Sequence, residues 1–187
     1  MRLIFLSHPE VVIDPAVPVP DWSLSGKGRA RLERAAAAGW PSVERIVSSS
    51  ERKAREAADI LGIARKIQPD VHPGLAEIDR SATGFVSHER HEALAQRLFD
   101  EPDQSADGWE TARHAQDRAI GALREVLSTP ADVLIVGHGG TGTLIWCHLA
   151  GSKIDRAHDQ KAMGSVWTAC GPQFTPESGW QSLESVL

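Results

Sequence analysis

The chain opens with a short apolar stretch that ends at a histidine, Arg2-Leu3-Ile4-Phe5-Leu6-Ser7-His8-Pro9-Glu10. A continuous apolar run of this kind is typical of a buried strand. A second stretch far along the chain repeats the design, Asp132-Val133-Leu134-Ile135-Val136-Gly137-His138-Gly139-Gly140. If both strands belong to one parallel sheet, His8 and His138 lie at its carboxyl edge, where open α/β sheets bind ligands. The two stretches therefore predict an α/β fold with a crevice between two histidines.

Length and composition favour one soluble cytoplasmic domain. The chain has 187 residues, enough for one sizeable core, so we expect a single domain over residues 1–187. Its net charge of −5 argues against nucleic acid or an anionic membrane as a partner, because such binding relies on clustered lysine and arginine. Cys147 and Cys170 lack a metal-ligand spacing, and no apolar run is long enough to cross a membrane. No pattern indicates an oligomeric state.

The order of elements predicts a three-layer α/β/α architecture with a mostly parallel sheet. We expect further strands at residues 43–47, 67–71 and 165–169, and helices at residues 25–38, 51–61, 87–99, 109–127 and 141–150. Residues 11–20 are rich in proline, which removes the backbone donors of a helix or central strand. That segment is therefore expected to be a loop beside His8.

The start of the helix at residues 51–61 combines hydroxyl groups with cations. Ser48, Ser49 and Ser50 are expected to supply the N-cap, because serine oxygens accept the unpaired N–H groups of a first turn. Basic residues follow immediately, although cations at a helix start oppose the helix dipole. Either an anion binds at this helix start, or the cations form a solvated basic face.

Five short motifs, spread from Leu3 to about Ala169, resemble those of the histidine phosphatase superfamily, which has the phosphoglycerate mutase-like fold. The matching segments are Ser7-His8-Pro9-Glu10 for the family's Arg-His-Gly-Glu, Leu24-Ser25-Gly26-Lys27-Gly28 for Leu-Thr-x-x-Gly, residues 48–58 for Ser-Ser-x-x-x-Arg-Ala-x-x-Thr-Ala, Trp109-Glu110-Thr111 for Gly-Glu-Ser, and His138-Gly139-Gly140 for His-Gly-Gly. The family's acidic position falls on Glu77.

This resemblance implies a phosphatase that hydrolyses a phosphomonoester through a phosphohistidine on His8, without metal or organic cofactor. Its substrate is a small phosphorylated molecule. The resemblance also implies that His138 stabilises the charge of the phosphoryl group and that Glu77 protonates the leaving oxygen. The residues expected to bind the substrate phosphate are Ser7, Lys53 and Gly139.

The chain departs from the family at two arginine positions, which are Ser7 and Lys53 here, and at Pro9, where the family has glycine. Arginine grips a phosphate in two places, whereas lysine is a point charge and serine carries none. The alternative hypothesis is therefore a catalytically impaired member that binds a phosphorylated ligand or a protein partner. The residues considered as substitutes for the missing charge are Arg52, Arg55 and Arg80.

Two further patterns suggest other chemistry. Residues 137–142 fit the Gly-x-Gly-x-x-Gly fingerprint of a dinucleotide-binding turn, but the following residues 151–156 lack the strand and terminal acid that this fold needs. His88 and His91 lie one helical turn apart without a third ligand at a recognisable spacing. We rank the dinucleotide hypothesis below the phosphatase and interpret the histidine pair as an exposed polar face.

Overall fold

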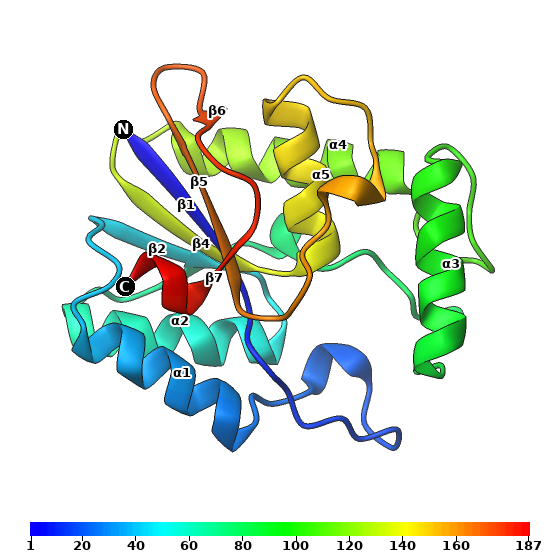
Figure 1. The fold of residues 1–187 in the computed structure, drawn as a ribbon, viewed down its shortest axis with the longest axis horizontal. Coiled ribbons are helices and arrows are strands. Elements are labelled where there is room, and N and C mark those ends of the chain that lie inside the picture. The colour runs from blue at the N-terminus through cyan, green and yellow to red at the C-terminus, as the bar shows by residue number, and fades with distance from the viewer.

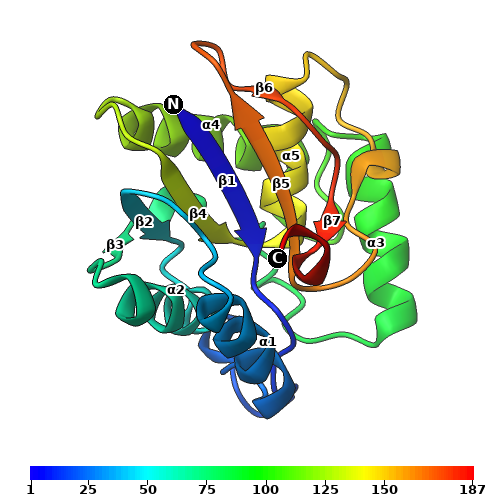
Figure 2. The same cartoon turned by 60° about the vertical axis from the view of Figure 1, so that its left-hand side comes forward.

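A computed structural model describes all residues from 1 to 187, and its centre is a seven-stranded mixed sheet. In spatial order the strands are β3 (Asp70–Val71), β2 (Arg45–Ser48), β4 (Val133–Gly137), β1 (Arg2–Ser7), β5 (Ser165–Cys170) and β6 (Thr175–Pro176), with β7 (Gln181–Ser182) also paired to β5. The first four strands in this order are parallel to one another, and β5 runs antiparallel to β1. Figure 2 shows β1 between β4 and β5.

Helices cover both faces of the sheet (Figure 1). One face carries α1 (Gly26–Ala37) and α2 (Arg52–Arg65), and the other carries α4 (Ala112–Leu127) and α5 (Gly139–Leu149). The remaining helix, α3 (His88–Asp100), packs outside α4 and α5. Short 3-10 turns complete the chain: η1 (Val19–Asp21), η2 (Pro73–Leu75), η3 (Arg156–His158) and η4 (Leu183–Val186). None of the helices combines the length and hydrophobicity of a membrane-spanning segment.

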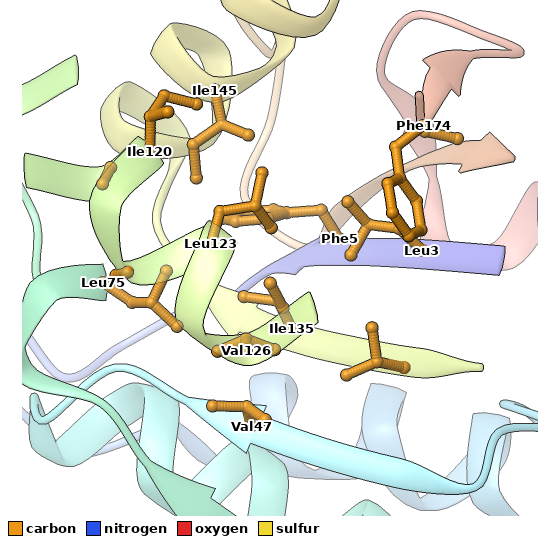
Figure 3. Packing of buried hydrophobic residues seen from close by; sticks show 14 of the residues in the cluster. Leu3, Phe5, Val47, Leu75, Ile120, Leu123, Val126, Ile135, Ile145 and Phe174 are labelled. Carbon is orange, nitrogen blue, oxygen red and sulfur yellow. The ribbon is translucent and has the colours of Figure 1, made fainter. Parts of the chain in front are cut away.

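The side chains of β1 explain why its sequence is apolar throughout. Because successive residues of a strand point to opposite faces, Leu3 and Phe5 pack on the α4/α5 side, whereas Ile4 and Leu6 pack on the α1/α2 side. Figure 3 shows Leu3 and Phe5 packed among side chains of α4 and α5. The strand is therefore buried on both faces, as the apolar run predicts.

The register of the parallel strands aligns their ends. Ser7 of β1 lies opposite Gly137 of β4, and the next residue, His8, donates its backbone N–H to the Gly137 oxygen at 2.9 Å. On the other side of β4, the Ser49 N–H bonds to the Val136 oxygen at 2.9 Å. Three strands therefore end side by side, and each delivers a polar side chain to the same edge.

The predicted three-layer α/β/α architecture with a mostly parallel sheet is confirmed, with differences in the boundaries of its elements. The strand expected at residues 67–71 is only Asp70–Val71, because Pro69 lacks the N–H that a ladder needs. The helix expected to end at Leu61 continues to Arg65 and ends where Lys66 adopts a left-handed conformation. The helix expected at residue 141 begins at Gly139, directly after His138.

The expected serine cap of α2 is wrong. Glu51 occupies the N-cap position, and no side chain bonds to the first turn. Ser49 instead accepts the Glu51 N–H at 3.1 Å and contacts His138, because the strand end turns its hydroxyl towards β4. Its role is therefore at the edge of the sheet and not at the helix start.

Gly142 gives a direct test of how α5 packs on the sheet. A Cβ at Gly142 would lie 2.5 Å from Cε1 of Phe5 and 2.8 Å from the Trp180 ring, and the buried Phe5 has no room to move. We expect Gly142→Ala to lower the free energy of unfolding by about 1–3 kcal/mol, as overpacking does. The matched control is Gly121→Ala in α4, where no atom lies within 4 Å of the added carbon. That variant should gain about 0.5–1 kcal/mol in urea unfolding, because alanine favours a helix. Equal stability of the two variants would contradict this packing.

Candidate functional site

The two predicted histidines lie together at the carboxyl edge of the sheet. Their ring centroids are 5.2 Å apart, with an angle of 71° between the planes. Nδ1 of His8 lies 2.9 Å from the Pro9 carbonyl oxygen. Because a carbonyl oxygen only accepts hydrogen bonds, Nδ1 carries the proton, and the lone pair of the neutral ring is on Nε2. The turn at Pro9 therefore fixes both the tautomer and the orientation of the first histidine.

Both imidazoles are neutral near pH 7 in the ligand-free protein. Burial lowers the pKa of His8 to about 3, and the nearby His138 adds to this effect. Burial also lowers the pKa of His138, which has no exposed surface. Nε2 of His138 lies 2.7 Å from the Ser49 hydroxyl, whereas its buried Nδ1 has no hydrogen-bond partner. His8 thus has a free lone pair on Nε2, and His138 has an Nδ1 without a hydrogen-bond partner.

The Glu77 carboxylate is bound to the first turn of α5. Oε1 accepts hydrogen bonds from the N–H groups of Ile78 at 3.0 Å and Thr141 at 2.8 Å, and from the Thr141 hydroxyl at 2.9 Å. Oε2 accepts from the Gly140 N–H at 3.1 Å. Glu77 therefore occupies the N–H groups that an anion would otherwise meet at this helix start.

These contacts determine the charge of Glu77. Burial opposes its ionisation, but His138, Arg80 and the N–H donors lower the pKa of Glu77 to about 2. The carboxyl group is consequently ionised in the ligand-free protein. A role in protonating a leaving group requires that it first takes up a proton.

Lys53 is buried at the expected position, but its charge is already matched. Its ammonium group, 3% exposed as a residue, donates to the Val19 oxygen at 2.8 Å and to a carboxylate oxygen of Glu51. Glu51 also accepts the Glu77 N–H at 2.9 Å and lies 3.5 Å from Nε2 of His138. Burial opposes the ionisation of Glu51, whereas His138 and Lys53 lower its pKa. Lysine at this position is therefore one half of a buried ion pair.

Ser7 has a different place from the one expected for a phosphate ligand. It is fully buried, and its hydroxyl accepts the Ser165 N–H at 3.0 Å and bonds to the side-chain oxygen of Gln160. The amide nitrogen of Gln160 then lies over Gly139, where an added Cβ would be only 2.2 Å away. Ser7 orients Gln160, which sequence reasoning missed because residue 160 lies in a loop without a motif.

These side chains surround a cleft of about 480 Å³. Its lining includes His8, Lys53, Glu77, Arg80, Gly139 and Gln160. Of the three arginines considered, only Arg80 reaches this cleft, whereas Arg52 and Arg55 line a separate hollow. The Arg80 guanidinium bonds to His91 and lies 5.5 Å from the centre of the Trp109 ring. Its positive charge helps to keep Glu77 ionised.

The motif at residues 109–111 supports the loop that carries Glu77. Glu110 accepts a hydrogen bond from Arg118 at 2.7 Å, and Arg118 in turn donates to the backbone oxygens of Gly74 and Ala76. Thr111 caps α4 by accepting the His114 N–H at 3.1 Å. Glu110 and Thr111 position the loop and do not line the cleft around His8, whereas Trp109 is part of its lining.

The dinucleotide hypothesis for residues 137–142 is wrong. The strand after α5 is β5, which is antiparallel to β1, so the required parallel unit is missing. The glycines allow close packing instead: Gly139 against Gln160, and Gly140 against Glu77. His91 of the other pattern bonds to Arg80 and Glu92. No group of three or more potential ligands is arranged to hold a metal ion.

The cluster of Ser49, His138 and Glu51 contains the residue types of a serine–histidine–acid triad but lacks its geometry. Such a triad needs the serine and the acid on opposite nitrogens of the imidazole. Here Ser49 at 2.7 Å and Glu51 at 3.5 Å both approach Nε2. Ser49 is also fully buried, so it orients His138 and does not present a nucleophile.

The sequence matches the histidine phosphatase superfamily (branch 1) over residues 15–168. The matched range includes Glu77 and His138 and begins after His8, so the place of His8 in the site comes from the geometry above. A comparison with curated proteins finds no match.

Solved structures share the fold over nearly the whole chain. A mycobacterial glucosyl-3-phosphoglycerate phosphatase in complex with VO3 has a TM-score of 0.80 at 22% identity, covering 97% of this chain and 98% of that chain. Bacillus stearothermophilus YhfR has a TM-score of 0.78 at 20% identity, with 96% of both chains covered. An Entamoeba histolytica phosphoserine phosphatase with 3-phosphoglyceric acid has a TM-score of 0.79 at 15% identity, covering 100% and 99%. With a family match over most of its length and the same fold as these structures, the chain belongs to branch 1 of the histidine phosphatase superfamily.

Proposed function

We propose that the protein hydrolyses a phosphomonoester through a phosphohistidine on His8. The observation that carries this proposal is the free lone pair on Nε2 of His8, held beside His138 by the bond from Nδ1 to the Pro9 oxygen. A neutral imidazole is the nucleophilic form, and the lowered pKa keeps His8 in that form near pH 7. Membership of the superfamily supports the same reaction class.

The proposed reaction has two steps. Nε2 of His8 attacks phosphorus and forms the N–P bond, while the bond to the leaving oxygen breaks and Glu77 donates a proton to that oxygen. Water then attacks the phosphohistidine, Glu77 takes the proton of that water, and inorganic phosphate leaves. The Pro9 carbonyl stabilises the positive charge that develops on the imidazole, because it accepts the Nδ1–H throughout.

Charge opposite the phosphoryl oxygens comes from groups around the cleft. His138 offers an unpartnered nitrogen, Lys53 offers an ammonium group and Gln160 offers its amide N–H. An incoming phosphate dianion raises the pKa of neighbouring groups, because negative charge favours their protonated forms. Glu77 and His138 then take up protons, and Glu77 becomes able to act as an acid.

The relatives support a small phosphorylated substrate. The mycobacterial phosphatase is solved with inorganic phosphate and with VO3, and the Entamoeba enzyme with 3-phosphoglyceric acid. One observation favours the alternative of a binding protein with little turnover, namely the neutralisation of Lys53 by Glu51. The two hypotheses differ in whether His8 acquires a phosphoryl group.

The nucleophile is tested with a labelled aryl phosphate. We expect the protein to trap an acid-labile, base-stable phosphoryl group on His8, and His8→Ala to lose at least about 1000-fold in kcat/KM, or about 4 kcal/mol of transition-state stabilisation. The exposed His148→Ala in α5 is the matched control and should retain activity. Phosphate binding without label or turnover would support the binding protein. Label that persists in His8→Ala would exclude His8.

The neutral state of His8 is tested by stability at two pH values. The unfolded chain binds a proton on His8 below about pH 6.5, whereas the folded chain, with Lys53 and His138 nearby, does not until about pH 3. The free energy of unfolding therefore decreases as the pH is lowered from about 6.5 towards about 3. Between about pH 7.5 and 5, His8→Gln should lose about 2 kcal/mol less than the parent in urea unfolding. A parent-like loss in His8→Gln would contradict the neutral state of the His8 ring in the folded protein.

Gln160 is tested together with Ser7. We expect Gln160→Ala to lower kcat/KM and phosphate affinity about tenfold, because a hydrogen bond contributes about 1 kcal/mol and more to a charged partner. Ser7→Ala should act in the same direction, and the double variant should be no worse in phosphate affinity than Gln160→Ala alone. Ser7→Arg should lower activity, because the buried site has no room for a guanidinium group. A gain of activity in Ser7→Arg, or additive losses in the double variant, would show that Ser7 meets the ligand itself.

A further inference from the structure

A second cleft, of about 630 Å³, adjoins the one that holds His8. The two clefts share four residues at their border: Val19, Glu77, Ile78 and Arg80. Glu77 is the proposed acid, so the leaving oxygen of a bound phosphomonoester lies at this border. The rest of the leaving group then extends into the second cleft.

One wall of the second cleft is the loop at residues 15–20, which presents almost no hydrogen-bond donor. Pro15, Pro18 and Pro20 have no N–H. The Ala16 N–H bonds to the Asp14 side chain at 2.9 Å, and the Val17 N–H bonds to the Asp14 carbonyl at 3.0 Å. A carboxylate or a polyhydroxyl group placed against this wall finds few donors.

This wall is braced and does not depend on a ligand for its shape. The Trp22 indole N–H lies 3.0 Å from the carbonyl oxygens of both Asp14 and Val17, and Lys53 holds the Val19 oxygen at 2.8 Å. Phe85 adds an aromatic surface to the lining, with its ring centre 5.6 Å from that of Trp22 and 43% of the residue exposed. The cleft therefore offers preformed apolar and aromatic surface.

The charged residues of the lining oppose an anionic guest. Two carboxylates of the lining, Glu77 and Asp79, stand against the single cation Arg80, whose guanidinium bonds to His91 and lies over Trp109, while the third carboxylate, Glu51, is paired with Lys53. The oxygens of Glu51 and Glu77 already accept hydrogen bonds within the protein. Fixed negative charge beside an apolar wall excludes acidic groups by repulsion and by loss of hydration.

We propose that the second cleft binds an uncharged, ring-bearing apolar leaving group, so that the substrate is the phosphomonoester of such an alcohol and not a phosphorylated sugar acid. This inference rests on the proposed function and separates this chain from the relatives solved or named with phosphoglycerate compounds.

The test compares three alkyl phosphates with similar leaving oxygens: 2-phenylethyl phosphate, glycerol 3-phosphate and 3-phosphoglycerate. We expect kcat/KM for 2-phenylethyl phosphate to be at least about tenfold higher than for the other two. Phe85→Ala should reduce this preference several-fold, mainly by raising KM for 2-phenylethyl phosphate. It should leave kcat/KM for 3-phosphoglycerate unchanged. Asp79→Asn should raise kcat/KM for 3-phosphoglycerate. Ile63→Ala, at an exposed position of α2 outside both clefts, is the control and should change none of these values.

Dissociation constants of the same three compounds, measured by calorimetry, distinguish failure of the inference from failure of the phosphatase. Absence of turnover for all three, with 2-phenylethyl phosphate still bound most tightly, would contradict the phosphatase and support the cleft assignment. Equal or tighter binding of 3-phosphoglycerate would overturn the inference, whatever the turnover. Equal slowing of all three substrates by Phe85→Ala would overturn it as well.

Discussion

Ser7 of β1 lies opposite Gly137 of β4, and the site depends on this parallel register. It places His8 and His138 one residue beyond the same edge of the sheet, where their ring centres come within 5.2 Å. The register is set by burial on both faces of β1, because a slip of one residue would turn Leu3 and Phe5 away from α4 and α5. The hydrophobic core therefore fixes the distance between the two imidazoles.

The charges around these imidazoles balance one another before any ligand arrives. Lys53 is paired with Glu51, and Glu77 is held by the N–H groups of α5 and kept ionised with the help of Arg80. Such a buried arrangement is tolerated because its carboxylate oxygens accept hydrogen bonds, which offsets the cost of desolvation. In the cleft lining, Arg80 and Lys161 are the cations without a carboxylate partner, and Lys53 is already matched by Glu51. A phosphate dianion beside the neutral imidazoles and the ionised Glu77 favours their protonated forms, so we expect its binding to be coupled to proton uptake.

The fold could be predicted from the sequence because strands buried on both faces give continuous apolar runs, and because His8 and His138 each end such a run. The short β3 and the early start of α5 were harder to predict. In those places a proline and a strand-to-helix turn set the boundary, and helical periodicity carried no signal.

The site was predictable in its positions and less so in its contacts. His8, Glu77, Lys53 and Gly139 line one cleft and His138 lies beside His8, while their roles in catalysis and phosphate binding stay predictions. The sequence could not indicate that Glu51 pairs with Lys53, since the two residues lie close along the chain but the pairing depends on burial. It could not indicate the bond between Ser7 and Gln160 either, because 153 positions separate them. Long-range polar contacts of this kind leave no periodic pattern.

Proton uptake on dianion binding is the most direct test of whether the imidazoles are neutral and Glu77 is ionised in the ligand-free site. Sulfate is suitable because it carries no titratable proton near neutral pH, and calorimetry in two buffers with different ionisation enthalpies gives the number of protons taken up. We predict an uptake of about one proton for each sulfate bound near pH 7, because the imidazoles are neutral and Glu77 is ionised before sulfate binds. Sulfate binding without proton uptake would contradict this prediction, since the site would then hold its positive charge in advance.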